Sequence, residues 1–283
     1  MKASAHRSLF GPPQLLVLPA VLLIGGLYLF ALLRVLWLSL SDPSFGLGNY
    51  RLLLSDATIQ RVIWTTVWIC VVATVITVVI GYVIAYAMAH VRSRERRVIL
   101  LCIMLSFWLS VLVRTFAWVM LLRRNGVVNE LFLSLGLISL PLTMIYNNAG
   151  VIIGMVHVMV PLATLPIYAN LSAIDPSLMN AARGLGCGPT KSFLYVYLPL
   201  SKEGIAAATV LVFVFSLGFY ITPAILGGGK VLMVAEYIEF QFHETLRWGV
   251  AAMMATLLLI AVLLVLALAA RVTGLQRFTA RTP

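Results

Sequence analysis

The segment that decides the fold is residues 173–199, which read AIDPSLMNAARGLGCGPTKSFLYVYLP. Asp175 followed by Pro176 predicts a helix start, because Asp can cap free backbone amides and proline suits the first helical turn. The helix is expected to run through Asn180, Ala181 and Ala182 and to stop near Gly186. Two alanines on such a helix leave its backbone open to close approach, which suits a surface that another protein grips.

A second short helix is expected to begin near Thr190. It must end by Leu198, because Pro199 disfavours helical backbone at the residue before it. The segment is therefore predicted to hold two short helices. Taken alone, it fits a docking surface and a plain helical linker equally well.

The rest of the chain is dominated by apolar residues. It has 283 residues, of which 62% are hydrophobic and 10% charged, and a mean hydropathy of +1.04, which lies outside the range of soluble domains. A transmembrane helix needs roughly 20 apolar residues. Six stretches qualify, at approximately 15–40, 62–89, 98–122, 149–172, 203–222 and 248–270. The sequence thus predicts an all-α polytopic membrane protein with six transmembrane helices.

Lys and Arg residues indicate the orientation of these spans. Twelve of the 20 lie in segments on the same side as the N-terminus, with the densest cluster at 92–97. Cytoplasmic loops carry such an excess, so both termini and the 173–202 loop are expected in the cytoplasm. Loop charge then accounts for the net charge of +11, and no nucleic acid is expected as a partner. The domains are a tail at 1–14, a single transmembrane domain at 15–270 and a tail at 271–283.

Two segments need a separate interpretation. The first apolar stretch is too long for a signal peptide and lacks a small-residue cleavage site, so it is interpreted as an uncleaved anchor. Residues 123–148, on the outer side, open with the turn signal Asn125-Gly126 and continue through an apolar segment too short to span. Either a short helix at the outer surface or a re-entrant element fits that pattern.

The spacing within 180–199 resembles the EAA loop of ABC importer permeases, whose pattern is Glu-Ala-Ala, three residues, Gly, nine residues and Ile-x-Leu-Pro. Val196 is a close substitute for Ile, whereas Asn180 departs from the usual Glu, so the salt bridge of that Glu is in doubt. The remaining positions match: Ala181, Ala182, Gly186, Leu198 and Pro199. In that family the loop is a coupling helix that docks on the ATP-hydrolysing subunit, and the resemblance implies this role for all seven positions.

Other segments are similar to spermidine/putrescine-type permeases. The run from Arg114 to Trp118 looks like their third-span region, and residues 216–223 look like the end of their fifth span. The resemblance implies a type I ABC importer permease in a bacterial inner membrane, surrounded by lipid. Its implied partners are a second homologous permease, two ATP-binding cassette subunits and a periplasmic solute-binding protein. The leading solute is a polyamine, and the alternatives are another small amine, an amino-acid-like solute or an anionic solute.

No catalytic or metal site is expected in this chain. Residues 227–230 are not a phosphate loop, because Ala224 stands where the first Gly should be and Val231 replaces the required Ser or Thr. Glu239 and His243 are one helical turn apart, but two ligands are few for any metal. The chain is therefore expected to be a transport subunit and not an enzyme, with ATP and Mg bound by the partner ATPase.

The candidates for the substrate pathway are Arg114, Tyr168, Phe219, Tyr220 and Thr222. Several polyamine permeases carry an acidic residue at the position of Phe219, although an aromatic ring can still attract an ammonium group. A charged residue within a span is costly. Arg114 therefore either lines the cavity near the outer gate or snorkels to the outer interface. In the pathway its charge would repel a polyamine unless a carboxylate neutralised it.

A secondary transporter or channel is the alternative class, since it needs no ATPase. Such a protein should show inverted repeats or discontinuous spans with buried acids. The predicted spans contain no Asp or Glu apart from Glu203 at an inner edge, which argues against proton or sodium coupling. His157, in the fourth span, is interpreted as a hydrogen-bonded packing residue.

Overall fold

The computed structural model describes residues 12–272, and every regular element in that range is helical. Four helices are long and apolar enough to cross a membrane: α1 (Pro12–Ser41), α3 (Ala57–His90), α7 (Asn148–Ser172) and α14 (Trp248–Val272). Two bent pairs of shorter helices bring the number to six when each pair is one span. The expected all-α, six-span fold is confirmed, while most of the two expected tails, 1–14 and 271–283, lies outside the described residues.

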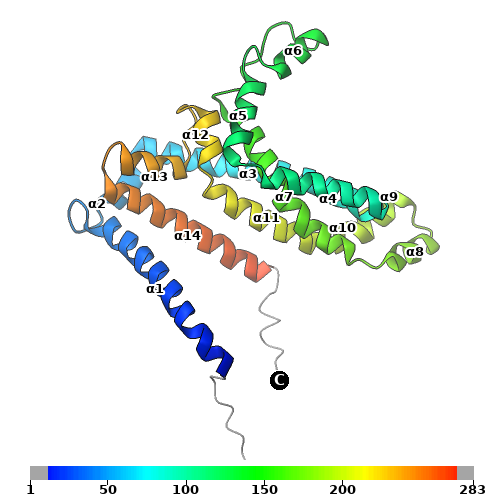
Figure 1. Ribbon diagram of the computed structural model, residues 1–283, viewed down its shortest axis with the longest axis horizontal. Helices are drawn as coiled ribbons and strands as arrows, with labels where there is room; N and C mark the ends of the chain where they lie inside the picture. The colour runs from blue at the N-terminus through cyan, green and yellow to red at the C-terminus, as the bar shows by residue number, and fades with distance from the viewer. Residues whose placement is uncertain (1–11, 273–283) are drawn as a thin grey trace, which may run out of the picture.

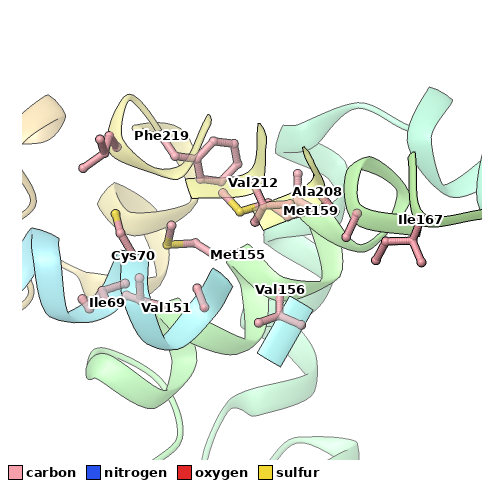
Figure 2. Packing of buried hydrophobic residues seen from close by; sticks show 14 of the residues in the cluster. Ile69, Cys70, Val151, Met155, Val156, Met159, Ile167, Ala208, Val212 and Phe219 are labelled. Atoms are coloured by element: carbon pink, nitrogen blue, oxygen red, sulfur yellow. The ribbon is translucent and has the colours of Figure 1, made fainter. Parts of the chain in front are cut away.

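The core lies where α3, α7 and α11 (Lys202–Leu217) pack together (Figure 1). One apolar cluster takes Ile69, Met155 and Val212 from these three helices (Figure 2). Gly81 allows α3 to approach α7 closely, because a Cβ there would lie 2.8 Å from the Cβ of Ala163. Small residues at such contacts let membrane helices gain van der Waals packing, which replaces the hydrophobic effect inside lipid.

The third expected span, 98–122, is not one helix. Instead, α4 (Ser93–Trp108) and α5 (Val111–Leu122) are separated by extended backbone at 109–110. The axes of Ser93–Trp108 and Val111–Ser134 differ by 96°. The span has no glycine or proline that would reveal the break. Ser110, a residue type favoured before a helix, is the local signal.

A short helix, α6 (Val127–Ser134), follows α5 and projects with it from the bundle (Figure 1). The short helix expected within 123–148 is therefore present. Asn129 closes this loop: its side-chain amide donates to the carbonyls of Arg123 (3.1 Å) and Leu142 (3.0 Å) and accepts from the Leu142 amide (2.8 Å).

The fifth span is also shorter than the expected 203–222. It ends at Leu217, and a separate helix, α12 (Ile221–Gly227), begins after Tyr220. Gly218, a poor helix former, caps α11 and explains the early end. Two of the pathway candidates, Phe219 and Tyr220, therefore lie in the break between these helices.

The 173–202 loop contains α8 (Pro176–Gly184), α9 (Pro189–Ser192), a π-helical turn η1 (Phe193–Tyr197) and α10 (Leu198–Leu200). The expected helix end at Leu198 is wrong, because Leu198 has helical φ −64° and ψ −43° and the helix continues through Pro199. The π turn explains this, since the Leu198 amide bonds to the Phe193 carbonyl five residues back. A turn this wide makes room for a proline ring that would clash in a regular helix.

The opposite end of the long helices carries α2 (Gly48–Ser55), α12 and α13 (Val234–His243) (Figure 1). There α13 contacts α14 and α3, and α1 contacts α14. Residues 21–33 of α1 are exposed along their whole length, so α1 contributes little to the core.

Candidate functional site

The first candidate site is the helix α8, whose start is fixed by Asp175. The Asp175 Oδ1 accepts a hydrogen bond of 2.8 Å from the Ser177 amide, and Pro176 occupies the first turn as expected. The bond from Ser177 lowers the pKa of the Asp175 carboxyl. The negative charge of Asp175 also interacts favourably with the positive end of the helix dipole. Both effects stabilise the start of α8.

The end of α8 is closed by a Schellman motif centred on Gly186. The Cys187 amide bonds to the Ala182 carbonyl (3.1 Å), and the Gly186 amide bonds to the Arg183 carbonyl (2.9 Å). Gly186 has φ +85°, a left-handed conformation that glycine adopts at no steric cost. The glycine of the family pattern therefore has a backbone reason in this chain.

The seven residues of the family pattern differ in accessibility. Asn180, Ala181, Gly186 and Pro199 are exposed, and Val196 and Leu198 are half-buried. Ala182 is only 8% exposed, so the expectation that both alanines are open to a partner is wrong for this one. Its helix α8 contacts α9 and η1, which accounts for covered positions on α8. A partner would instead meet the outer face of α8 and Leu185, which is 87% exposed.

Rings of α3 lie beneath the loop. The ring of Tyr86 contacts the rings of Phe193 (5.7 Å between centroids), Tyr197 (5.5 Å) and His90 (4.1 Å). In addition, the Ser201 hydroxyl donates to the Tyr82 hydroxyl at 3.3 Å. We call Tyr82, Tyr86, His90, Phe193 and Tyr197 the loop aromatic cluster. It joins the π turn to the end of α3 and so connects the loop mechanically to the core.

The second candidate site lies at the other end of the helices, around Arg114 on α5. Arg114 is 6% exposed, and its Nε and Nη1 have no hydrogen-bond partner within the described chain. The neighbouring Thr115 hydroxyl shares a hydrogen bond of 3.0 Å with the Thr222 hydroxyl of α12. Two predicted pathway residues, Arg114 and Thr222, are therefore brought into one neighbourhood, and the side chain of Arg114 is buried within it.

His157 on α7 belongs to the same neighbourhood. The Trp118 indole donates a hydrogen bond of 3.1 Å to His157 Nδ1, and Trp118 follows Arg114 by one helical turn. A cavity of about 570 Å³ lies beside them, with Trp118, His157 and Ser106 as the polar groups in an otherwise apolar lining. The interpretation of His157 as a hydrogen-bonded packing residue fits its bond to Trp118.

The other pathway candidates are spread out. Phe219 is 8% exposed and packs in the core cluster near Met155 and Val212, with its ring 5.6 Å from that of Phe215 (Figure 2). Tyr168 lies on α7, eleven residues beyond His157, which is about 16 Å along the helix. Tyr220 is 38% exposed. The structure does not bring these three aromatic residues together into one route.

Two acidic residues of α13 that the sequence did not assign to the pathway, Glu236 and Glu239, interact electrostatically with Tyr220. Burial raises the pKa of the Glu236 carboxyl to about 7; a hydrogen bond from the Met233 amide opposes this rise, and the Glu239 charge adds to it. The signal available in the sequence was the pair of acids in a short segment between two spans. These carboxyls supply negative charge at the end of the molecule that carries α12.

Comparisons with known proteins agree with this fold. Residues 77–278 match the family described as "Binding-protein-dependent transport system inner membrane component". The spermidine/putrescine transport system permease protein PotB of Haemophilus influenzae is 32% identical over 59% of this chain and 61% of its own length, and that of Salmonella typhimurium 30% over 56% of each. These matches cover less than two thirds of the relatives. YdcU of Escherichia coli, an inner membrane ABC transporter permease protein, is 28% identical over 75% of this chain and 74% of its own.

Solved structures show the same arrangement of helices. A chain of a bacterial ABC transporter involved in alginate import superposes with a TM-score of 0.71, covering 91% of this chain and 95% of that chain at 16% identity. A chain of the MetNI methionine ABC transporter in an inward-facing conformation gives 0.56, covering 76% and 94% at 18% identity. At such identities the likeness extends to the fold alone.

Proposed function

Since this chain belongs to the binding-protein-dependent family of inner-membrane transport components, it is an ABC importer permease, and we propose that it is driven through the 173–202 loop. The observation that carries the proposal is α8, a short helix closed at both ends by side-chain and backbone caps and exposed on its outer face. A helix fixed in this way moves as a rigid body when a partner pushes it. Six of the seven positions of the family pattern also agree with the loop, counting Val196 as a substitute for Ile, and Asn180 is the departure.

In the proposed mechanism, ATP binding by a separate subunit moves α8, and the loop aromatic cluster carries the displacement to α3. Rings packed edge to face resist sliding because each contact has a preferred geometry. The helices α3, α7 and α11 then shift together and open the cavity to the outside. Hydrolysis returns them to the inward state. This chain supplies half of the pathway and binds neither ATP nor Mg itself.

The proposed assembly contains a second permease, two ATP-binding cassette subunits and a periplasmic solute-binding protein. A solved structure of the alginate transporter, whose permease chain is similar in fold to this one, is a complex with a solute-bound periplasmic protein. The distribution of Lys and Arg favours a cytoplasmic location for both termini and for α8. An ATPase subunit in the cytoplasm could then bind α8. We propose a heterodimer of permeases, with a homodimer as the alternative.

The proposed solute is a polyamine. Two observations support it. One is the named function of the PotB relatives, and the other is the electrostatic interaction of Glu236 and Glu239 with the exposed Tyr220. Carboxylates and an aromatic face both attract ammonium groups. The buried guanidinium of Arg114 is the observation that favours an anionic or amino-acid-like solute instead.

The test of coupling is isolation of the transporter from membranes through a tag on this chain. An ATPase should co-purify, and Gly186→Glu should abolish transport, because a side chain at φ +85° strains the backbone and a charge would disturb the docking face. Gly184→Glu is the matched control: it lies in α8 with open space around it, so it adds the same charge without the strain. If no ATPase co-purifies, or if Gly186→Glu transports normally, the coupling proposal fails.

The test of the solute is separate. Putrescine and spermidine should bind the co-purifying periplasmic protein and stimulate ATP hydrolysis by the complex. If that protein binds an anion and neither amine, the polyamine proposal fails while the coupling proposal stands.

A further inference from the structure

The positive charge of Arg114 is buried in the folded chain. Its side chain is only 6% exposed, and two of its three nitrogens, Nε and Nη1, have no hydrogen-bond partner among residues 12–272. A guanidinium does not deprotonate in proteins. A buried, unpaired charge is strongly unfavourable, and in membrane segments such residues face a partner or a water-filled cavity. Some acceptor must therefore meet Arg114 in the working transporter.

The polar groups around Arg114 are short of acceptors. Trp118, one turn further along α5, can only donate, and its indole uses His157 Nδ1 as the acceptor. The neutral His157 ring therefore carries its proton on Nε2 and is itself a donor there. The Thr115 hydroxyl donates to the Val111 carbonyl (2.8 Å) and is shared with Thr222. Arg114 and Trp118 are four residues apart on α5 and so share one face of that helix. The bond from Trp118 therefore places His157 on the side of α5 that carries Arg114.

We propose that Arg114 and His157 together form a binding site for one carboxylate group. A carboxylate is an acceptor without donors, and it accepts two parallel hydrogen bonds from a guanidinium. It would satisfy the free nitrogens of Arg114 and the Nε2 proton of His157 at once. The apolar cavity beside His157 and Trp118 provides the space from which such a group can approach.

The carboxylate has two sources. One is an Asp or Glu side chain of the second permease, which depends on the proposed assembly and remains compatible with a polyamine solute. The other is a carboxylate on the transported solute itself, which would replace the polyamine proposal. The predicted spans of this chain supply no carboxylate of their own for Arg114, because Glu203 at the inner edge is their one acidic residue.

The experiment uses the complete transporter isolated through a tag on this chain, with Arg114→Gln, Arg114→Lys and the control Arg123→Gln. Arg123 is exposed at the end of α5, so its variant removes a charge without opening the site. The probes are putrescine and 4-aminobutyrate, which differ in that a carboxylate replaces one aminomethyl group. The measurements are recovery of the second permease, binding of each probe and solute-stimulated ATP hydrolysis.

A carboxylate on the second permease predicts that Arg114→Gln lowers recovery of that subunit about tenfold or more, whichever probe is present. A carboxylate on the solute predicts normal recovery and a loss of 4-aminobutyrate binding of the same order, with putrescine unaffected. Arg114→Lys keeps the charge and should show a smaller loss in the same measurement, so the test remains decisive if Arg114→Gln does not accumulate. If both variants match Arg123→Gln in recovery, binding and ATP hydrolysis, the carboxylate site is overturned. Co-purification of an ATPase is unaffected by that result, so failure of this site is distinguishable from failure of the coupling proposal.

Discussion

The hydroxyls of Thr115 on α5 and Thr222 on α12 lie 3.0 Å apart, although 107 residues separate them in the sequence. Each helix follows a break in an expected span, since α5 follows the break after α4 and α12 follows the break after α11. A second bond, of 2.8 Å, joins the Tyr146 amide to the Leu226 carbonyl at the end of α12. The two breaks therefore create one packed unit at this end of the molecule, and Arg114 precedes Thr115 of its central hydrogen bond.

Replacing Thr222 with valine should loosen that unit. The Thr115 hydroxyl already donates to the Val111 carbonyl, so the Thr222 hydroxyl is the donor of the shared bond. Its loss should lower the free energy of unfolding by about 1 kcal/mol and lower the melting temperature of the purified protein. A double-mutant cycle with Thr115→Val should show coupling between the two sites. Thr209→Val, at an exposed Thr bonded to its own helix, is the control, and a cycle without coupling would contradict the interpretation.

Gly81→Leu should disrupt the core contact between α3 and α7. A Cβ at Gly81 would lie 3.2 Å from the backbone nitrogen of Thr164, which cannot move as a side chain end can. Overpacking typically costs about 1–3 kcal/mol, and a leucine adds more bulk than a single methyl group. The measurement is folded protein recovered in detergent, with Gly25→Leu on the open surface of α1 as the control. Equal recovery of the two variants would show that the helices are not in close contact.

Tyr86→Ala should separate ATP hydrolysis from transport. It removes the ring that contacts Phe193, Tyr197 and His90 and so weakens the connection between the loop and α3. We expect the complex to assemble and hydrolyse ATP while its transport falls about tenfold, a change that corresponds to about 1.4 kcal/mol of coupling. Tyr195→Ala removes an equivalent ring that is 76% exposed in the same turn and should transport normally. Normal transport by Tyr86→Ala would place the transmission elsewhere.

Glu236 should make the stability of the protein fall as pH rises. Its pKa is about 7 in the folded chain against an ordinary value of 4.5, so between these values the folded state binds more protons than the unfolded state. Stability is then lost progressively as pH rises from 4.5 to 7 and is constant above that range. Glu236→Gln should remove this part of the pH dependence and raise the melting temperature at pH 8. Glu130→Gln, at an exposed acid of α6, should retain the wild-type slope between pH 5 and 8.

The sequence predicted the class of fold and the position of α8 along the chain, because both depend on local signals. Apolar length set the spans, and Asp175, Pro176 and Gly186 set the ends of α8. The breaks within the third and fifth spans were missed, since hydropathy continues through residues 109–110 and 218–220 without a charge. The burial of Arg114 and the hydrogen bond from Trp118 to His157 depend on contacts between helices distant in sequence, including those of α5 with α7, which no local pattern encodes. Likewise, Pro199 alone predicted a helix end that the neighbouring π turn avoids.

The broken spans also affect the lipid. α4 and α11 each have 16 residues, which is about 24 Å of helix, whereas the hydrocarbon of a typical bilayer is about 30 Å thick. Leu101, Leu105 and Trp108 are exposed along α4, so wherever that face meets lipid the membrane must thin to match it. Such thinning has an energetic cost that grows with acyl-chain length. Transport in vesicles of shorter-chain phospholipid should consequently be faster than in longer-chain vesicles of the same headgroup, which makes bilayer thickness a factor in the working cycle of this permease.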